Sequence, residues 1–393
     1  MRILYLANEE IPGRMGGSVH AWEVARGLVQ RGHAVTALVH RGEGQAARFE
    51  REGVVIIREN LKLRGKMVPL RGLPAAARLA RTSDVVMERY LTQGGAGAIL
   101  ARKRGIPLLL EVNSPHVEEL IWRFGIGPAL VGRALRGWVD WQFASARVSV
   151  APRASIVPAA ARDRVRVRGW GVNADRFSPD AARDSSAAAF RERHQLAGRL
   201  PVIFSGSFRR WHGVLDIPEI ARRTLAREPR VKFVLLGEGD LLGDVRAAVS
   251  AAGLEKDVVV AGSVPYDEMP GIVASCAIGI APYDAEAYPP LARFGFFWSP
   301  LKVFEYLACG VPAVLFGYEG LREHVGEAER GLAVPPRDLE AFAEAIAQLA
   351  GDEEARRTMG EAGRRYVAAA HSWSDHVAWL EDCLREAMGE SSA

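Results

Sequence analysis

Short runs of apolar and β-branched residues alternate along the chain with longer segments whose apolar positions recur at helical spacing. In the first half, runs of strand character fall at residues 3–6, 34–39, 54–57, 84–87, 107–111 and 147–150. Helical patterns such as that of residues 19–30 separate them. Parallel strands that are buried on both faces read as continuous apolar runs and need a helical crossover between them. The pattern therefore predicts an α/β domain with a doubly wound parallel sheet.

The alternation weakens over residues 169–200, which are rich in Gly, Asn, Ser and Pro, and then resumes. The second set of expected strands lies at residues 202–205, 232–236, 258–261, 278–281, 313–315 and 332–334. A final amphipathic helix with two tryptophans is expected over residues 371–388. Because 393 residues are too many for one hydrophobic core, we expect two doubly wound, Rossmann-like domains facing each other across a cleft. Ligands should bind at the carboxyl ends of both sheets.

The composition is that of a globular protein, with 49% hydrophobic and 25% charged residues. We expect no transmembrane helix, because no apolar run reaches about 18 residues, and the first strand is too short for a signal peptide. The three cysteines, Cys276, Cys309 and Cys383, are odd in number and far apart. They fit neither a disulfide framework nor a zinc site and favour a reducing compartment, so we expect a cytoplasmic protein.

The net charge of +4 conceals a difference between the two halves. Residues 1–198 carry 31 Lys and Arg against 18 Asp and Glu, whereas residues 199–393 carry 20 against 29. The basic excess is concentrated in residues 58–81 and 123–168. Such a surface suits an anionic partner, for example a membrane or an acidic acceptor, but arginine-rich solvated surfaces give the same pattern. No nucleic-acid-binding motif accompanies the charge, so we expect no nucleic-acid partner.

Glycines follow three of the expected strands. Gly16 and Gly17 open the first helix, with Ser18 as a candidate cap, and their amides would face an anion. A surface turn is the alternative, and the spacing is not that of a dinucleotide fingerprint. Gly237, in LLGEGD, gives a weaker signal of the same kind. In FSGSFRRWHG, Arg209, Arg210 and His212 crowd the start of a helix, where an anion such as a diphosphate would offset their charge; solvated arginines are again the alternative.

Lys302 and Glu305 lie on one face of an otherwise apolar helix, within SPLKVFEYLACGVPAV. Pro300 suits the first turn of this helix, and Gly310 suits its end. A surface ion pair worth a few tenths of a kcal/mol is one interpretation. The other gives Lys302 a phosphate and Glu305 two ribose hydroxyls, since a carboxylate can accept both hydrogen bonds.

These motifs together resemble the retaining, GT-B-fold glycosyltransferases of the "glycosyl transferases group 1" family. The resemblance runs in order through MGGSVHAWEVARGLVQRGHAVTAL, DVVMERY, GIPLLLEVNSPHVEE, GWGVNADRFSP, FSGSFRRWHGV, VLLGEGD, VVVAGSVPYDEMP and SPLKVFEYLACGVPAV. It implies an acceptor-side domain of residues 1–170, completed by a crossing helix at 371–393. A donor-binding domain would comprise residues 171–370.

The resemblance also implies roles for individual residues. Gly16 and Gly17 would approach the donor phosphates, and Glu305 would hold the ribose. Lys302, with the backbone near Ser299 and Leu301, would contact the diphosphate. The loop that borders the base would be Gly262, Ser263 and Val264.

Two motifs of the family pattern are altered, at three positions. Phe297 replaces the first acid of the E-x7-E motif, which in many relatives touches hydroxyls of the donor sugar. Ser207 and His212 replace the Arg and Lys of the phosphate-binding R-x4-K pair. We hypothesise that Arg209 and Arg210 supply the missing positive charge.

The acceptor side is expected in the first domain. His116 lies just past a strand and would position the acceptor or transfer a proton, although a structural histidine fits equally well. Further candidates for contact with acceptor hydroxyls are Glu9, Glu10, Arg89, Asn113 and Glu119. Arg89 could instead form an internal ion pair with Glu111.

The resemblance implies a hexosyltransferase that uses a UDP- or GDP-sugar and a glycan, lipid-linked or small-molecule acceptor. Lys302, Arg209 and Arg210 would stabilise the leaving diphosphate without a metal, and the departing phosphate would take the proton of the acceptor in a front-face, retaining reaction. Two alternatives remain open: a nucleotide-sugar epimerase or hydrolase on the same fold, and a nucleotide-binding module without catalysis. The basic first half also suggests peripheral association with the inner face of an anionic membrane.

Overall fold

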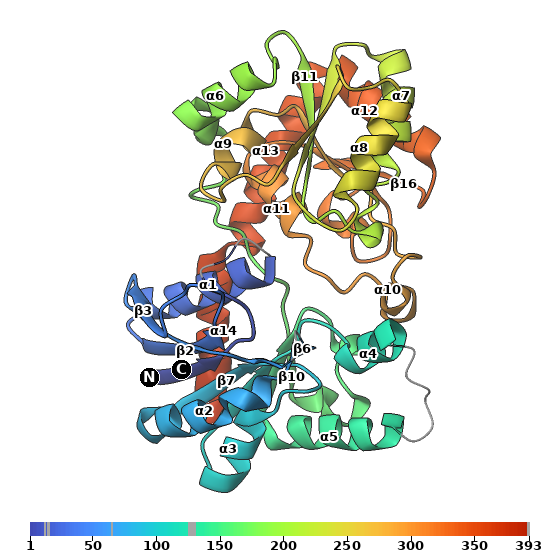
Figure 1. The fold of residues 1–393 in the computed structure, drawn as a ribbon. Helices are drawn as coiled ribbons and strands as arrows, with labels where there is room; N and C mark the ends of the chain where they lie inside the picture. The colour runs from blue at the N-terminus through green and yellow to red at the C-terminus, as the bar shows by residue number, and fades with distance from the viewer. Residues whose placement is uncertain (12, 14–15, 64–65, 125–130, 391–393) are drawn as a thin grey trace. The chain divides into compact units, whose positions relative to one another are not determined.

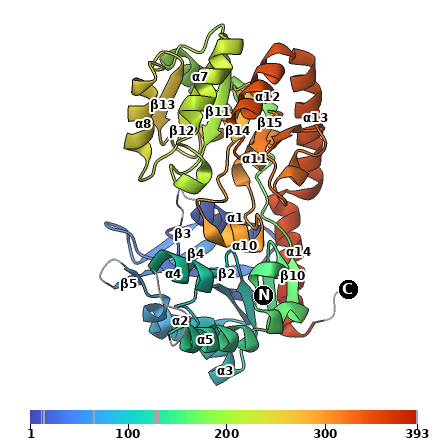
Figure 2. The same cartoon turned by 90° about the vertical axis from the view of Figure 1, so that its right-hand side faces the viewer.

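A computed structural model describes residues 1–11, 13, 16–63, 66–124 and 131–390 (Figures 1 and 2). The chain forms two compact units. Unit 1 comprises Met1–Trp170, Phe297–Ser299 and Trp373–Ala393, and unit 2 comprises Gly171–Phe296 and Pro300–Ser372. Among the described helices, none is both long enough and apolar enough to cross a bilayer.

Unit 1 is built on an eight-stranded sheet of order β10-β9-β8-β7-β1-β2-β4-β3, parallel except for the β3–β4 pair. Its strands are β1 (Arg2–Leu6), β2 (Ala34–His40), β3 (Arg48–Arg51), β4 (Val54–Glu59), β7 (Val85–Arg89), β8 (Leu108–Glu111), β9 (Val148–Ala151) and β10 (Val165–Val167). The strands β5 (Lys62–Leu63) and β6 (Lys66–Met67) form a separate antiparallel pair. The central strands β1, β7 and β8 are almost wholly buried, as expected for a sheet covered on both faces.

The helices of unit 1 cover this sheet. They are α1 (Gly16–Gln30), α2 (Leu73–Leu79), α3 (Ala96–Arg104), α4 (His116–Phe124), α5 (Val131–Ser145) and α14 (Trp373–Met388), with short 3₁₀ turns η1 (Pro69–Gly72), η2 (Ala80–Thr82), η3 (Ala154–Ile156) and η4 (Ala159–Arg164). α14 packs against α1. The contact needs Gly27, because a Cβ atom there would lie 2.7 Å from the Val377 side chain. The last helix of the chain is thereby fixed to the first.

Unit 2 has a six-stranded, all-parallel sheet of order β13-β12-β11-β14-β15-β16. Its strands are β11 (Leu200–Ser205), β12 (Val231–Leu236), β13 (Val258–Gly262), β14 (Ile278–Ala281), β15 (Ala313–Phe316) and β16 (Gly331–Val334). Its helices are α6 (Ser185–Arg193), α7 (Ile217–Arg227), α8 (Leu242–Ala251), α9 (Met269–Ala274), α10 (Pro289–Phe294), α11 (Leu301–Ala308), α12 (Leu339–Gly351) and α13 (Glu353–Ala370), with 3₁₀ turns η5 (Pro179–Arg183), η6 (Arg210–His212) and η7 (Arg322–His324). Fully buried Phe204, Phe233, Phe316 and Phe342 form part of its core.

The predicted α/β architecture with two parallel sheets is confirmed, and each of the twelve expected strands is present within two residues of its predicted bounds. The sequence pattern missed β3, β10 and the β5–β6 pair. One further detail is wrong: α1 begins at Gly16, so Ser18 lies inside its first turn and does not cap it. Gly310 has φ +71° just past α11, as its predicted role at the helix end requires.

Candidate functional site

Lys302 is a buried cation at the start of α11. The residue is only 6% exposed, and its Nζ lies 4.0 Å from the Phe204 ring centroid and 4.9 Å from that of Tyr283. Within the described structure, this Nζ has no hydrogen-bond partner. A buried ammonium that makes only cation–π contacts is costly in free energy. This environment is therefore unusual for a lysine that has a purely structural role.

Glu305 follows one helical turn later and shares this desolvated environment. Burial lowers the pKa of Lys302 to about 7, although the Glu305 carboxylate acts in the opposite direction. Burial raises the pKa of Glu305 to about 8, again opposed by Lys302. Lys302 Nζ and the Glu305 carboxylate oxygens, all in the described part of the structure, lie more than 4.0 Å apart, so the two side chains form no direct ion pair. An arriving anion would restore the charge of Lys302.

Tyr306 anchors α11 to the sheet and thereby positions both side chains. Its hydroxyl accepts a hydrogen bond from the Ser205 amide at 2.8 Å and donates to the Ile280 carbonyl at 3.4 Å. Room for its ring exists only because residue 279 is glycine: a Cβ atom there would lie 2.2 Å from the ring. The start of α11 is thus fixed near the carboxyl ends of β11 and β14.

Gly206, directly after β11, forms the floor beside Lys302. Its φ is +144°, and a Cβ atom there would lie 2.9 Å from Lys302 Nζ and 3.5 Å from His212 Nδ1. His212 Nδ1 donates to the Ser207 carbonyl at 2.7 Å, which leaves Nε2 as an acceptor. Burial, and then the Lys302 charge, hold the pKa of His212 well below its usual range. A neutral His212 cannot replace the positive charge of the family's lysine.

The loops after β11, β12 and β13 are joined by their backbones. The Gly206 amide donates to the Leu236 carbonyl and the Gly237 amide donates to the Gly262 carbonyl, both at 2.9 Å. A Cβ atom at Gly237 would lie 1.8 Å from the Gly206 carbonyl oxygen. Gly237 is therefore required for the packing of these loops, independently of any contact that it makes with a ligand. Ser263 Oγ donates to Glu238 Oε1 at 2.5 Å in the same group of loops.

The two arginines of FSGSFRRWHG lie at the start of η6 and differ in their surroundings. Arg209 is ion-paired with Asp240 at 2.6 Å and lies over the Trp211 ring. Arg210 is exposed. Arg209 would therefore have to leave Asp240 to bind a phosphate, whereas Arg210 is accessible as it stands.

In unit 1, a second polar cluster is buried around Glu111, at the end of β8. Arg89 Nη1 lies 3.2 Å and His20 Nε2 2.6 Å from Glu111 Oε1, and Tyr5 donates to Oε2 at 2.8 Å. The suggested Arg89–Glu111 ion pair is confirmed. Arg89 also contacts Glu9 at 3.0 Å. Arg89 and His20 hold the pKa of Glu111 well below its usual range despite its burial.

Trp170 connects this cluster to the two later segments of unit 1, Phe297–Ser299 and Trp373–Ala393, which are separated from it in the sequence by parts of unit 2. Its indole donates to Asn113 Oδ1 at 2.9 Å, and its ring stacks on His20 at 4.3 Å between centroids. Its amide donates to Ser299 Oγ at 2.8 Å, and His376 Nδ1 donates to the neighbouring Gly169 carbonyl at 3.0 Å. Residues 169–170, Phe297–Ser299 and the first turn of α14 are thus tied together.

Of the remaining predicted residues of unit 1, Gly17 lies beside the Glu111 cluster, since a Cβ atom on it would lie 3.2 Å from Glu9 Oε1 and 3.6 Å from Arg89 Nη2. Gly16 and Glu10 are exposed, and Glu119 is half-buried on α4. The side chain of His116 lies outside the described part of the structure, although its backbone begins α4.

Phe297, at the position of the missing acid, is buried in unit 1, where its ring contacts Trp298 with a 5.6 Å centroid separation. Its side chain thus has a packing partner in the described structure.

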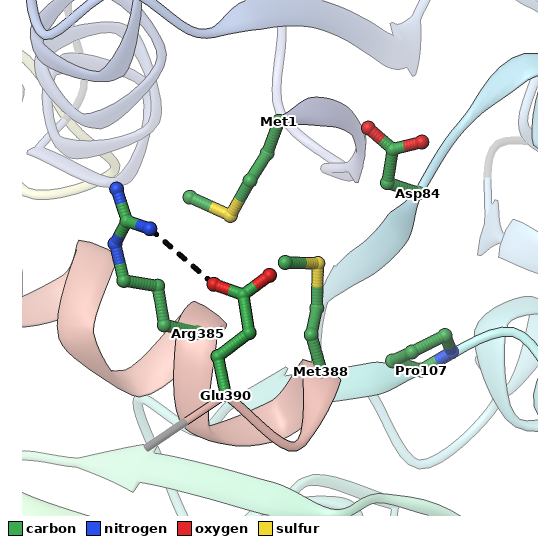
Figure 3. Close-up of a pocket in the computed structure, with 6 residues that line it drawn as sticks. All are labelled: Met1, Asp84, Pro107, Arg385, Met388 and Glu390. Carbon is green, nitrogen blue, oxygen red and sulfur yellow. Dashed lines mark hydrogen bonds and ion pairs between the residues drawn. The ribbon is translucent and has the colours of Figure 1, made fainter. Parts of the chain in front are cut away.

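A surface pocket in unit 1 contains none of the predicted site residues. Met1, Asp84, Pro107, Arg385, Met388 and Glu390 line it (Figure 3). Asp84 and Pro107 stand just before β7 and β8, so this pocket lies at the amino ends of the strands. Its charged groups already have partners, because Asp84 binds Arg2 and Arg385 binds Glu390. Ligands of doubly wound sheets bind at the opposite edge, and we assign this pocket no role.

His20, Trp170 and Tyr306 are site residues that the sequence analysis did not identify. His20 and Tyr306 occupy apolar faces of helices, where a histidine or tyrosine reads as core. Trp170 lies in GWGVNADRFSP, one of the segments that carry the family resemblance, and its local sequence indicates no role for its ring. His20 lies one turn into α1, and Trp170 ends the first segment of unit 1. Their roles can be recognised only in the fold, which brings both to the Glu111 cluster.

Acidification should destabilise the protein through its buried histidines. Burial lowers the pKa of His376 to about 3 and also lowers that of His20. The unfolded chain therefore binds protons first as the pH falls below about 6.5, and the free energy of unfolding decreases in that range. In His376→Asn, which can keep the bond to Gly169, urea unfolding at about pH 7.5 and about pH 5 should differ by about 2 kcal/mol less than in the wild type. An unchanged difference would contradict a neutral His376.

Comparison with known proteins shows which proteins this chain resembles. Residues 15–176 match the model of Glycosyltransferase Family 4, and residues 199–352 match that of Glycosyl transferases group 1. A GDP-mannose-dependent alpha-(1-6)-phosphatidylinositol monomannoside mannosyltransferase of Mycobacterium tuberculosis is 26% identical over 98% of both chains.

Two solved structures are similar over nearly the whole chain. Sucrose-phosphate synthase from Thermosynechococcus elongatus has a TM-score of 0.75 at 18% identity and covers 99% of this chain and 100% of its own. Anabaena HepE in complex with UDP has a TM-score of 0.72 at 16% identity, covering 98% and 100%. Together with the two parallel-sheet units, these matches identify the chain as a glycosyltransferase with the GT-B fold.

Proposed function

We propose that the protein is a retaining hexosyltransferase that binds the diphosphate of a UDP- or GDP-sugar at the start of α11. The observation that carries this proposal is the buried Lys302 Nζ, which has no hydrogen-bond partner in the described structure and lies next to Gly206. A diphosphate oxygen would supply the missing partner and the opposite charge. Glu305, on the same face, would accept the hydrogen bonds of the ribose hydroxyls.

The chemical task of these residues is to stabilise the departing diphosphate. As the glycosidic bond to the donor breaks, negative charge grows on the phosphate oxygens, and a preorganised ammonium in a desolvated site stabilises it strongly. Arg210 is the exposed cation that could join Lys302, with Arg209 after it leaves Asp240. Neutral His212 could accept a hydrogen bond at Nε2. In a front-face reaction the departing phosphate oxygen itself takes the acceptor proton, so this step requires the cations that stabilise the phosphate and no separate protein base.

For the acceptor, we propose a hydroxyl-bearing glycan or lipid headgroup bound near Glu9, Glu10 and Asn113 in unit 1. The similarity to a mannosyltransferase named for a phosphatidylinositol monomannoside supports a lipid-linked acceptor. GDP-mannose is the donor named for that relative, and UDP is the ligand named for HepE. Both nucleotides are therefore the first to test, and peripheral association with an anionic membrane follows from a lipid acceptor.

Nucleotide binding should be accompanied by proton uptake. At about pH 9 Lys302 is mostly neutral and Glu305 mostly ionised in the free protein, because their pKa values are about 7 and about 8. A bound diphosphate raises the pKa of Lys302, so binding should take up about one proton. Thermal shift with UDP and GDP identifies the ligand, and calorimetry at about pH 9 in buffers of different ionisation enthalpy counts the protons.

The Lys302→Met variant is the control, and its residual binding should occur without proton uptake. Equal uptake in both proteins would contradict a diphosphate at Lys302. Incubating the sugar nucleotide without an acceptor separates the alternatives: an epimerase would release a new sugar nucleotide, whereas a transferase should give slow hydrolysis at most. Binding without turnover across an acceptor library would favour a non-catalytic module.

A further inference from the structure

The basic excess of the first half is concentrated on one group of helices. α2, α3 and α5 lie side by side in both views of the fold, and α3 packs against both of the others (Figures 1 and 2). With its flanking turns η1 and η2, α2 presents exposed Arg71, Arg78 and Arg81. The last turn of α3 adds three consecutive exposed cations at residues 102–104, and α5 adds exposed Arg133 and Arg136.

Acidic residues are nearly absent from these same elements. In η1, α2, η2, α3 and α5, all of which the structure describes, the single acid is Asp140. The pair α1 and α14, which also packs on the sheet of unit 1, has the opposite balance, with five acids and two arginines. A uniformly solvated arginine-rich surface would not divide in this way, so the charge is polarised within unit 1.

Two of these cations have acidic neighbours on other elements: Arg78 lies 4.0 Å from Glu59 and Arg136 lies 3.5 Å from Glu118. Three others donate to backbone carbonyls, which do not compensate their charge. Arg71 Nε donates to the Asn60 carbonyl at 3.1 Å, and Arg102 Nη2 donates to the Ala144 carbonyl at 3.1 Å. Arg104 also donates to a backbone carbonyl, that of Ala77. Carbonyl partners fix the direction of a guanidinium without neutralising it, and such an array favours an extended anionic surface over a single small anion.

Aromatic groups accompany the charge on α5. Trp138 and Trp141 stack with 4.9 Å between ring centroids, and both are half-buried. The same helix exposes the small residues Ala134 and Gly137 next to Arg133 and Arg136, which lets a flat surface approach closely. Indole rings beside cations are typical of surfaces that meet lipid headgroups.

We propose that the outer surface of η1, α2, η2, α3 and α5, here called the basic helix layer, docks on an anionic lipid bilayer. The proposal rests on the proposed function in one respect, since a lipid-linked acceptor gives the docking its purpose. The binding itself requires neither donor nor turnover, so the two proposals can fail separately.

The test compares two charge-reduced variants of the full chain that lose the same net charge. The first carries Arg81→Gln, Lys103→Gln and Arg136→Gln in the basic helix layer. The second carries Arg246→Gln, Lys256→Gln and Arg365→Gln, three exposed cations of unit 2. Flotation with phosphatidylcholine vesicles, with and without phosphatidylglycerol, measures partitioning. The first variant should lose about tenfold or more of the wild-type affinity for anionic vesicles, because each cation near the surface contributes separately; the second should stay within about twofold.

Wild-type binding should also weaken as salt is added, and neutral vesicles should retain little protein. Equal losses in both variants, or equal retention on neutral and anionic vesicles, would overturn the proposal. Duplex DNA serves as a competing polyanion: if it binds as tightly as the vesicles and releases the protein from them at equal charge, the layer is a general polyanion site and the membrane assignment is wrong. Nucleotide-induced thermal shifts in the first variant should match the wild type, which shows that the donor site is intact.

Discussion

Replacing Lys302 with methionine should lower kcat/KM for the donor by about 10²–10³-fold while leaving the protein at least as stable as the wild type. The expected loss of rate follows from removing a preorganised cation from a desolvated site. Stability should not fall, because the Nζ that is lost has no hydrogen-bond partner in the described structure and methionine can fill the space beside Phe204 and Tyr283. Steady-state kinetics and urea unfolding at about pH 7 measure the two effects.

Lys232 offers a matched control. It is also buried, with 6% exposure, and burial also lowers its pKa, but it lies near the amino end of β12, away from the loops that follow the strands. Lys232→Met should therefore leave turnover unchanged. If both variants kept wild-type turnover, Lys302 would be an ordinary buried lysine. If both lost it, the kinetic effect would reflect a general disturbance of the unit 2 sheet.

The hydrophobic pattern predicted the buried strands because each is a short apolar run, but it could not reveal strands without one. β3 (RFER) is exposed along its whole length at the edge of the sheet, and β10 (VRV) forms the other edge. The two-residue strands β5 and β6 are too short for any periodicity. Edge strands are recognised by pairing, which depends on the tertiary fold.

The placement of Lys302 and Glu305 on one face of α11 followed from helical spacing alone. The rest of the donor site did not, because it depends on contacts between distant segments. That Tyr306 holds α11 through Ser205, and that Gly279 makes room for it, cannot be inferred from local sequence. The tautomer of His212 is likewise fixed by the Ser207 carbonyl. In unit 1, Glu111, Arg89 and His20 come from three different elements, and only the pair of strand-end residues could be anticipated.

The largest effect on stability is expected at Glu111. Glu111→Leu should lower the free energy of unfolding by about 3–5 kcal/mol, because it removes a principal countercharge from buried Arg89 and an acceptor from Tyr5. Glu111→Gln should cost less, since it keeps an acceptor. Urea unfolding at about pH 7 measures both. An exposed pair, Arg357 with Glu354 at 2.6 Å, provides the contrast: Glu354→Ala should change the free energy of unfolding by about 0–1 kcal/mol.

The pH dependence separates an ionic role for Glu111 from simple packing. Because its folded-state pKa lies below the usual value, the stabilisation by its charge is complete above the unfolded pKa of about 4.5 and is lost as the pH falls toward the folded value. Glu111→Gln should flatten the stability profile in that acidic range. A double variant, Arg89→Met with Glu111→Leu, should be more stable than Glu111→Leu alone, because no buried guanidinium then remains beside residue 111 with only the partly exposed Glu9 as its countercharge. A double variant with the sum of both single losses would show that shape, and not charge, holds this cluster together.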